Sequence, residues 1–206
     1  MKFTTSAVIA STLAIVSASP IATADNSSNT DPFAATKPSV NEPFRLMSLR
    51  TGTPIQFGNV QAVKGGLSIN ALKQDSYCTE PDVNYATFTL TPEGDLYLYT
   101  PNPPLQAYVD RSGMGQGALQ FTTGVQPIGR NQERGPFAID DQSNLVFAAN
   151  NGIVGFQACP GTAENGWSVW LSGVSTPAGI EGCTPFTMKA LKEETPVRCN
   201  YNGMST

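Results

Sequence analysis

The stretch Phe88–Tyr99, FTLTPEGDLYLY, decides the fold class of this 206-residue chain. Apolar and polar residues alternate on both sides of a central turn, so the stretch predicts a β-hairpin with its large apolar side chains on one face. Phe137–Ala148, FAIDDQSNLVFA, matches it without gaps, 49 residues further along the chain. Two such hairpins indicate an internal repeat.

The repeat extends beyond the two hairpins. Leu105–Ala107 and Phe156–Ala158 follow them as similar third pieces, and a fainter third copy lies in Ile55–Ile69. Two clear copies and one faint copy favour a pseudo-threefold β-barrel of the trefoil kind. A β-prism or a β-sandwich built from similar hairpins is the alternative.

Short strand patterns separated by Gly, Pro, Asn and Asp also run through the rest of the chain. From Phe44 onward the length suits one domain with a sizeable core. We therefore expect a single all-β domain over residues 44–202, a β-barrel or β-trefoil-like fold held by two disulfides. Only Met188–Glu194 suggests a helix, which Pro196 would end.

Residues 1–24 have the features of an export signal. Lys2 precedes the apolar run Ala7–Val16, and small residues allow cleavage after Ala24 or Ala18. The run is shorter than the roughly 20 residues that span a bilayer, so we expect no membrane insertion. Residues 25–43 are polar and Pro-rich and predict a flexible leader, with a glycosylation sequon at Asn26. Residues 203–206 predict a flexible tail.

The four cysteines, Cys78, Cys159, Cys183 and Cys199, all follow the signal. An even number of cysteines in an exported chain predicts two disulfides. Zinc is a poor alternative, because the cysteines are not closely paired and the chain has no histidine. Three pairings are possible, and we favour Cys159–Cys183 with Cys78–Cys199.

The charge of the chain narrows its possible partners. The net charge is −4, and charged residues make up only 14% of the chain. Nucleic-acid binding needs a basic face, and docking on anionic lipid needs clustered basic residues. We therefore expect neither partner. An acidic, charge-poor surface rich in Gly and Pro suits the extracellular space or a polysaccharide wall.

The absence of histidine excludes Ser-His-Asp and Cys-His catalysis as well as His-based metal sites. Among the carboxylates, Asp140-Asp141 invites comparison with a glycosidase pair. Adjacent strand residues point to opposite faces, however, and Asp at a turn commonly caps its own backbone. Asp110-Arg111 is read in the same way, as a turn cap or local ion pair. We expect no catalytic residue, cofactor or metal.

Tyr108–Gly124, YVDRSGMGQGALQFTTG, predicts two strands joined by a glycine-rich turn. Gly113–Gly117 superficially resembles a phosphate-binding loop. A Rossmann loop is followed by a helix, whereas Ala118–Thr122 has a strand pattern. We interpret the glycines as residues that permit positive φ in a wide turn.

Aromatic residues are the best candidates for binding. Tyr97 and Tyr99 alternate with the apolar side of their hairpin and should point outward. Trp167 and Trp170 are three residues apart, so a strand would place one in the core and one outside. Exposed rings could stack on sugars, and all four are possible glycan contacts. The alternative is that the rings only cover an end of the barrel.

Several motifs together resemble a known family. They are LRTGTPIQFGNVQA (Leu49–Ala62), SYC (Ser76–Cys78), AYVDRSGMGQGALQFTTG (Ala107–Gly124), GFQACP (Gly155–Pro160), WSVW (Trp167–Trp170), GCTPF (Gly182–Phe186) and PVRCNY (Pro196–Tyr201). This combination resembles the fungal secreted cell-wall protein PhiA family, whose relatives are also described as IgE-binding proteins. The resemblance covers nearly the whole mature chain, and the cysteines match that family's positions.

The resemblance implies a non-enzymatic, secreted glycoprotein of the cell wall. It implies a contribution to wall organisation and to the development of phialides and conidia, the asexual spore-bearing cells and spores. The implied partners are wall polysaccharide or other wall proteins, and the oligomeric state is left open. A secreted carbohydrate-binding module is the alternative function. The family provides no catalytic residues to transfer.

Overall fold

The computed structural model describes residues 37–149, 151–162 and 164–201. The expected signal peptide with its cleavage sites, most of the leader including Asn26, and the tail at residues 203–206 lie outside the described residues.

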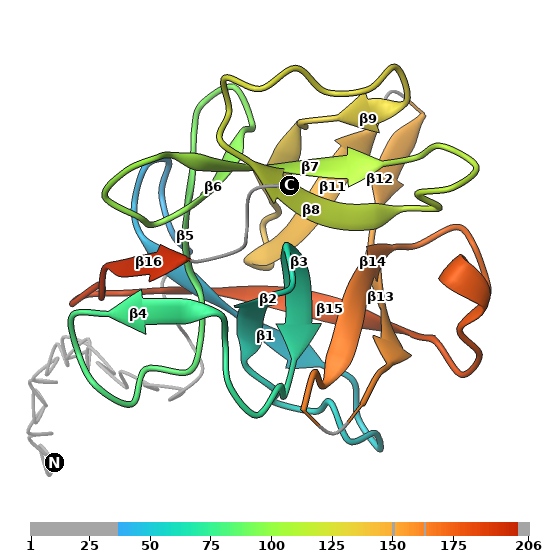
Figure 1. Cartoon of the computed structure of the whole chain (residues 1–206), viewed down its shortest axis with the longest axis horizontal. Helices are drawn as coiled ribbons and strands as arrows, with labels where there is room; N and C mark the ends of the chain where they lie inside the picture. The colour runs from blue at the N-terminus through green and yellow to red at the C-terminus, as the bar shows by residue number, and fades with distance from the viewer. Residues whose placement is uncertain (1–36, 150, 163, 202–206) are drawn as a thin grey trace, which may run out of the picture. The chain divides into compact units, whose positions relative to one another are not determined.

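Strands account for most of the regular structure (Figure 1). They are β1 (Phe44–Leu49), β2 (Val60–Val63), β3 (Gly66–Ile69), β4 (Ser76–Cys78), β5 (Thr87–Leu90), β6 (Leu96–Leu98), β7 (Leu105–Asp110), β8 (Ala118–Thr122), β9 (Gln132–Glu133), β10 (Phe137–Ile139), β11 (Asn144–Ala149), β12 (Gly152–Val154), β13 (Phe156–Pro160), β14 (Trp167–Leu171), β15 (Thr184–Lys192) and β16 (Cys199–Tyr201). A 3-10 helix, η1, spans Pro177–Gly179.

Nine antiparallel strands close into a barrel, in the order β1-β5-β6-β7-β8-β3-β14-β13-β15. β15 completes the ring by pairing with β1 over its whole length, from Phe44↔Lys192 to Leu49↔Thr187. Closure leaves no free edge in the ring, which distinguishes the fold from a β-sandwich. The expected all-β barrel is confirmed.

The sequence repeat is also a repeat of hydrogen bonds. In the β5–β6 hairpin Phe88 pairs with Leu98, and in the β10–β11 hairpin Phe137 pairs with Phe147. Both turns close with the same pair of backbone bonds, which join Thr91 to Asp95 and Gly94 in the first copy and Asp140 to Asn144 and Ser143 in the second.

β2 and β3 form a hairpin of another type. It lies in the region where the faint third copy was expected, and it closes over two residues, between Val63 and Gly66. Lys64 and Gly65 have φ values of 51° and 76°, as a type I′ turn requires. The two clear copies instead enclose five-residue turns, so the third unit does not reproduce their hairpin.

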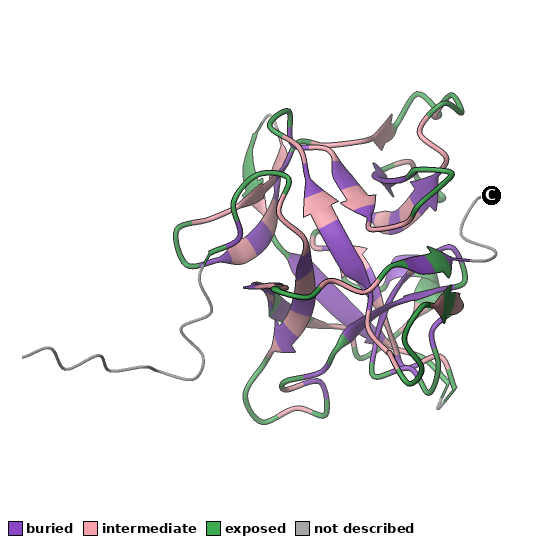
Figure 2. Cartoon of the chain, turned by 90° about the vertical axis from the view of Figure 1, so that its left-hand side faces the viewer, coloured by how far each residue is buried: buried purple, intermediate pink, exposed green. Residues whose placement is uncertain are grey.

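The core lies inside the barrel and is dominated by phenylalanine. Figure 2 shows strands that alternate between buried and partly buried residues, whereas the loops are largely exposed. The fully buried phenylalanines are Phe44, Phe88, Phe121, Phe137, Phe147 and Phe156. Burying each such side chain typically contributes about 1.5–3 kcal/mol. The Phe137 and Phe147 rings meet edge to face, 5.2 Å apart.

The prediction of a helix over Met188–Glu194 is wrong, because β15 occupies most of that segment. Tertiary pairing explains the difference. β15 pairs with β1, β11 and β13, and Met188 and Ala190 point into the core while Lys189 between them is partly exposed. Partners on both sides outweigh the modest local helix propensity of the segment.

The two disulfides join Cys78 to Cys199 and Cys159 to Cys183, as the favoured pairing had it. The first holds the separate two-stranded sheet of β4 and β16, and the second joins the end of β13 to the segment before β15.

Residues 37–43, which the sequence assigned to the leader, are hydrogen bonded to the domain. The Asn41 amide donates to Leu90 O at 2.8 Å, and the Glu193 amide donates to Pro43 O at 3.0 Å. The ordered domain therefore begins before Phe44.

Candidate functional site

The two tyrosines of the predicted glycan surface lie on and just after β6, with Tyr97 in the strand and Tyr99 following it. Tyr97 and Tyr99 are half-buried, while Leu96 and Leu98 beside them are buried. The Arg198 guanidinium lies 5.5 Å from the Tyr99 ring centroid, and its Nε donates to the Tyr99 hydroxyl at 3.3 Å. One face of Tyr99 therefore already has a cationic partner.

The two tryptophans lie on opposite faces of β14. Trp167 packs against the hydrophobic core, whereas Trp170 is on the outer face with Ser168. The Trp170 Nε1–H donates to Ser168 Oγ at 2.8 Å, and Ser168 Oγ donates to Cys159 O at 3.3 Å. This chain of hydrogen bonds orients the indole on the outside of the barrel.

The four aromatic residues do not form one surface. Around the barrel, β7, β8 and β3 separate β6 from β14. Trp170 borders a cavity that Trp167 does not line. The predicted glycan surface is therefore two separate candidates, the Tyr97 and Tyr99 pair and the outward-facing Trp170.

The cavity beside Trp170 measures about 370 Å³ and lies where three strands meet. β3 pairs with β8 at Gly66↔Gln120 and with β14 at Ser168, while β8 and β14 pair directly at Ala118↔Trp170. Inserting the end of β3 spreads β8 and β14 apart and leaves a hollow between them. A cavity of this size lies within the roughly 300–1,000 Å³ typical of small-molecule sites.

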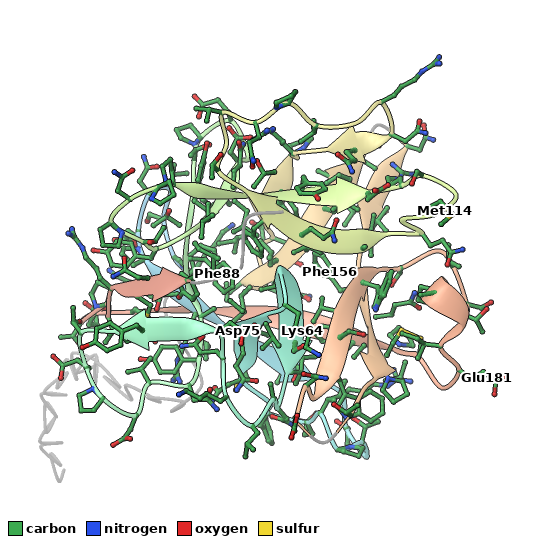
Figure 3. The ribbon with its side chains drawn as sticks, in the orientation of Figure 1. Lys64, Asp75, Phe88, Met114, Phe156 and Glu181 are labelled. Atoms are coloured by element: carbon green, nitrogen blue, oxygen red, sulfur yellow. A yellow bond between two sulfur atoms is a disulfide. The ribbon has the colours of Figure 1, made fainter. Side chains whose placement is uncertain are left out.

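Lys64 reaches the cavity from the β2–β3 turn. Its amide donates to Asp75 Oδ2 at 2.7 Å, and both residues are labelled in Figure 3. The Asp75 amide in turn donates to Ala62 O at 2.9 Å. These bonds hold the turn while leaving the Lys64 side chain exposed at the rim of the cavity.

The loop after β13 forms another wall. Asn165 Nδ2 donates to Thr162 Oγ1 at 2.7 Å, and the Gly166 amide donates to Thr162 O at 2.9 Å. Any side chain at Gly166 would collide with Ile69 O, so glycine is needed for this close approach to the end of β3.

Sequence reasoning identified Trp170 but missed Lys64, Gln120 and Asn165 as its neighbours. They come from separate segments, and only the pairing of β3 with two other strands brings them together. The one local signal was Lys64-Gly65-Gly66, which suits a tight hairpin turn.

Asp140 and Asp141 have separate partners. The Asp140 carboxylate accepts hydrogen bonds from the amides of Gln142 and Asn144, at 2.9 and 2.8 Å. Burial by itself raises the pKa of Asp140, but the bonds from Asn144 and Gln142 outweigh it and lower the pKa. Asp141 is exposed and pairs with Lys37 at 3.3 Å. Asp140 therefore caps the turn, as expected.

Asp110 and Arg111 also have separate partners. Asp110 accepts from the Ser112 amide and from Gln132 Nε2, each at 2.9 Å, whereas Arg111 pairs with Glu133 at 3.3 Å. Burial acts to raise the pKa of Asp110, yet its hydrogen bonds bring the pKa below the ordinary value. Asp110 caps the start of the glycine-rich turn.

Two glycines of that turn are required by its backbone geometry and packing. Gly117 has φ of 95°, and a side chain at Gly115 would collide with the Asp110 carboxylate. Met114, labelled in Figure 3, is 93% exposed at the tip. The strands on either side, β7 and β8, pair from Gln106↔Thr122 to Asp110↔Ala118, so this is a hairpin turn.

Within the described residues, no group of three or more His, Cys, Asp or Glu side chains is arranged to hold a metal ion. The same residues include no helix of the length and apolarity needed to cross a membrane.

Comparison with known proteins identifies relatives. The family model described as "PhiA-like secreted protein" matches residues 44–202. "Cell wall protein phiA" of Emericella nidulans is 37% identical over 172 residues, which is 82% of this chain and 92% of the relative. The protein of that name in Aspergillus niger is 37% identical over 171 residues, covering 82% of this chain and 90% of the relative. No solved structure matches the chain.

Proposed function

The chain belongs to the family of PhiA-like secreted proteins, and we propose that it is a non-enzymatic component of the fungal cell wall. Its location is extracellular, in the wall. We further propose that it contributes to wall organisation while phialides and conidia develop. The family relationship is the observation that carries this proposal.

The chemistry of the chain supports a non-enzymatic role. It contains no histidine, and its four cysteines are all in disulfides. The most suggestive carboxylate pair is engaged in structure, with Asp140 capping a turn and Asp141 paired to Lys37. Histidine-dependent and thiol catalysis therefore lack their usual groups.

The architecture supports a durable role outside the cell. A closed antiparallel barrel has no free edge in its ring, and two disulfides restrict the unfolded chain. Both features favour persistence where chaperones do not act. The low content of charged residues suits contact with largely uncharged polysaccharide.

Fractionation of the producing fungus tests the location and the mode of attachment. Walls are extracted in turn with detergent, mild alkali and glucanase, and the protein is followed by immunoblot. We expect it to remain through detergent and to be released by alkali or glucanase. Recovery in the culture medium alone would contradict a role in the wall.

Gene deletion tests the developmental role and the absence of catalysis together. We expect fewer phialides and conidia in the deletion strain, and full rescue by the wild-type gene. Rescue by an Asp140→Ala/Asp141→Ala variant is also expected, provided that the variant accumulates normally. Failure of an equally abundant variant would argue for carboxylate chemistry, and normal conidiation after deletion would remove the developmental proposal.

A further inference from the structure

We propose that the cavity between β3, β8 and β14 binds a pyranose unit of a neutral wall polysaccharide. This inference rests on the proposed function, because a protein of the wall meets polysaccharide at high local concentration. The cavity combines an oriented aromatic ring with hydrogen-bonding groups that have no partner among the described residues. That combination is what recognises a sugar, which presents C–H groups on one face and hydroxyls around its edge.

Trp170 supplies the apolar surface. It lies on the outer face of β14, and its N–H is already bound to Ser168 Oγ, so the hydrogen bond fixes the indole orientation. The indole thus offers the cavity ring surface and not a donor. A ring held in one orientation loses little freedom when a ligand stacks on it.

Polar groups converge from the other walls. The Tyr108 hydroxyl donates to Gln120 Oε1 at 2.7 Å, so the amide oxygen is engaged while the NH₂ group is not used in this bond. Within the described part of the chain, that NH₂ group and the Lys64 ammonium have no hydrogen-bond partner. Asn165 bonds to Thr162 through its amide nitrogen, and its Oδ1 accepts no hydrogen bond within the same described part of the chain. Two donors and one acceptor therefore remain for a ligand.

The charge of the lining points to a neutral ligand. Among the described residues that line the cavity, Lys64 is the only charged one and none is a carboxylate. A cationic ligand would lack a counter-charge. A polyanion would find one exposed lysine, which is too few for strong binding. The neutral hydroxyl groups of a sugar can instead each accept a hydrogen bond from an amide or ammonium donor.

The walls are fixed before any ligand arrives. The Cys159–Cys183 disulfide joins the β13 end, next to Pro160 and Gly161, to the segment that carries Ile180, and all three of these neighbours line the cavity. On the other side, Gly66 allows β3 to approach Leu119 O, where a side chain would come within 2.9 Å. Binding should therefore require little rearrangement.

The test measures binding of defined oligosaccharides to the mature full-length protein. Laminarihexaose, chitohexaose and mannohexaose represent β-glucan, chitin and mannan, and titration calorimetry gives their affinities. We expect at least one to bind, and Trp170→Ala to weaken it by about tenfold or more. Lys64→Asn, which keeps a residue that tolerates positive φ, should weaken it by a smaller factor.

Two further variants locate the site. Tyr97→Ala/Tyr99→Ala should bind as the wild type does, because β6 lies outside the cavity. Trp167→Phe leaves Trp170 as the only tryptophan, and its fluorescence should still change on titration. Circular dichroism and melting temperature show which variants are folded. If Trp170→Ala is not folded, Lys64→Asn/Asn165→Ala takes its place and should lose at least as much affinity as Lys64→Asn.

The inference fails if none of the three sugars binds at millimolar concentration, or if a folded Trp170→Ala variant binds as tightly as the wild type. Loss of binding only in the tyrosine variant would move the site to β6 and overturn it as well. Any of these results leaves the proposed function intact if fractionation still finds the protein in the wall. Absence from the wall, with sugar binding retained, would instead contradict the proposed function alone.

Discussion

Gly94 and Ser143 occupy the same position in two copies of one hairpin turn. Their φ values are 88° and 60°, and each offers its carbonyl oxygen to a later strand. Gly94 O accepts from the Phe137 amide at 2.7 Å, and Ser143 O accepts from the Ala190 amide at 2.8 Å. Each turn therefore joins its own hairpin to a later strand, β10 in the first copy and β15 in the second.

The first prediction is that these equivalent positions respond differently to substitution. A Cβ atom at Gly94 would lie 2.7 Å from Pro136 Cβ and 2.9 Å from Phe137 O, whereas Ser143 already carries a Cβ. Gly94→Ala should destabilise by about 1–3 kcal/mol, and Ser143→Gly should change stability by less than about 1 kcal/mol. Urea unfolding measures both. Equal effects would show that the two turns are packed alike.

The second prediction concerns alkaline pH. Burial raises the pKa of Tyr201 to about 12, against a hydrogen bond from the Thr87 amide that lowers it. The unfolded chain releases this proton near pH 10 and the folded chain only near 12. The contribution of Tyr201 to stability should therefore be complete below about pH 10. It should be lost as pH rises through this window, by on the order of 2–3 kcal/mol.

Tyr201→Phe provides the control, because it removes the ionisable group and keeps the ring. Its urea midpoint should fall less between pH 9 and pH 11 than that of the wild type. The same decline in both proteins would mean that Tyr201 is not the group responsible.

The third prediction compares the disulfides. Cys78–Cys199 spans 121 residues and Cys159–Cys183 spans 24. Chain-entropy arguments give about 5 kcal/mol for the longer loop and about 3–4 kcal/mol for the shorter one. Replacing the first pair with alanines should lower the unfolding free energy more than replacing the second. The reverse order would mean that native contacts around the shorter link outweigh loop entropy.

The fourth prediction separates Asp140 from Asp141. Asp140→Ala removes the acceptor for two backbone amides and should cost about 0.5–2 kcal/mol at neutral pH, whereas Asp141→Ala removes only an exposed ion pair and should be nearly neutral. The pKa of Asp140 is lowered in the fold, so its contribution is present above about pH 4 and lost as pH falls. Guanidinium unfolding at pH 7 and pH 3 should show the Asp140→Ala deficit shrinking in acid. An unchanged deficit would assign it to packing.

Local pattern was sufficient for the hairpins. The alternation in Phe88–Tyr99 and Phe137–Ala148 predicted both, because side chains on a strand point to opposite faces whatever the surroundings. The same pattern gave the hairpin of Tyr108–Gly124. It misled at Met188–Glu194, where the strand depends on partners far away in the sequence.

The candidate site, too, was only partly predictable from local sequence. Spacing alone placed Trp167 and Trp170 on opposite faces, but it could not say which face was the core. That choice depends on the phase of β14 against β3, β8 and β13. The cavity has no sequence signature, since it exists only because β3 inserts between β8 and β14.

The sequence by itself determined the all-β class, the repeated hairpins and the scarcity of catalytic groups, because composition and near-neighbour alternation act locally. Only the tertiary structure decided how the ring closes and which indole faces outward. It also decided that Lys64, Gln120 and Asn165 meet beside Trp170. Those features depend on strand pairing between distant segments, and the free energy of such pairing comes from contacts that exist only when the whole barrel has formed.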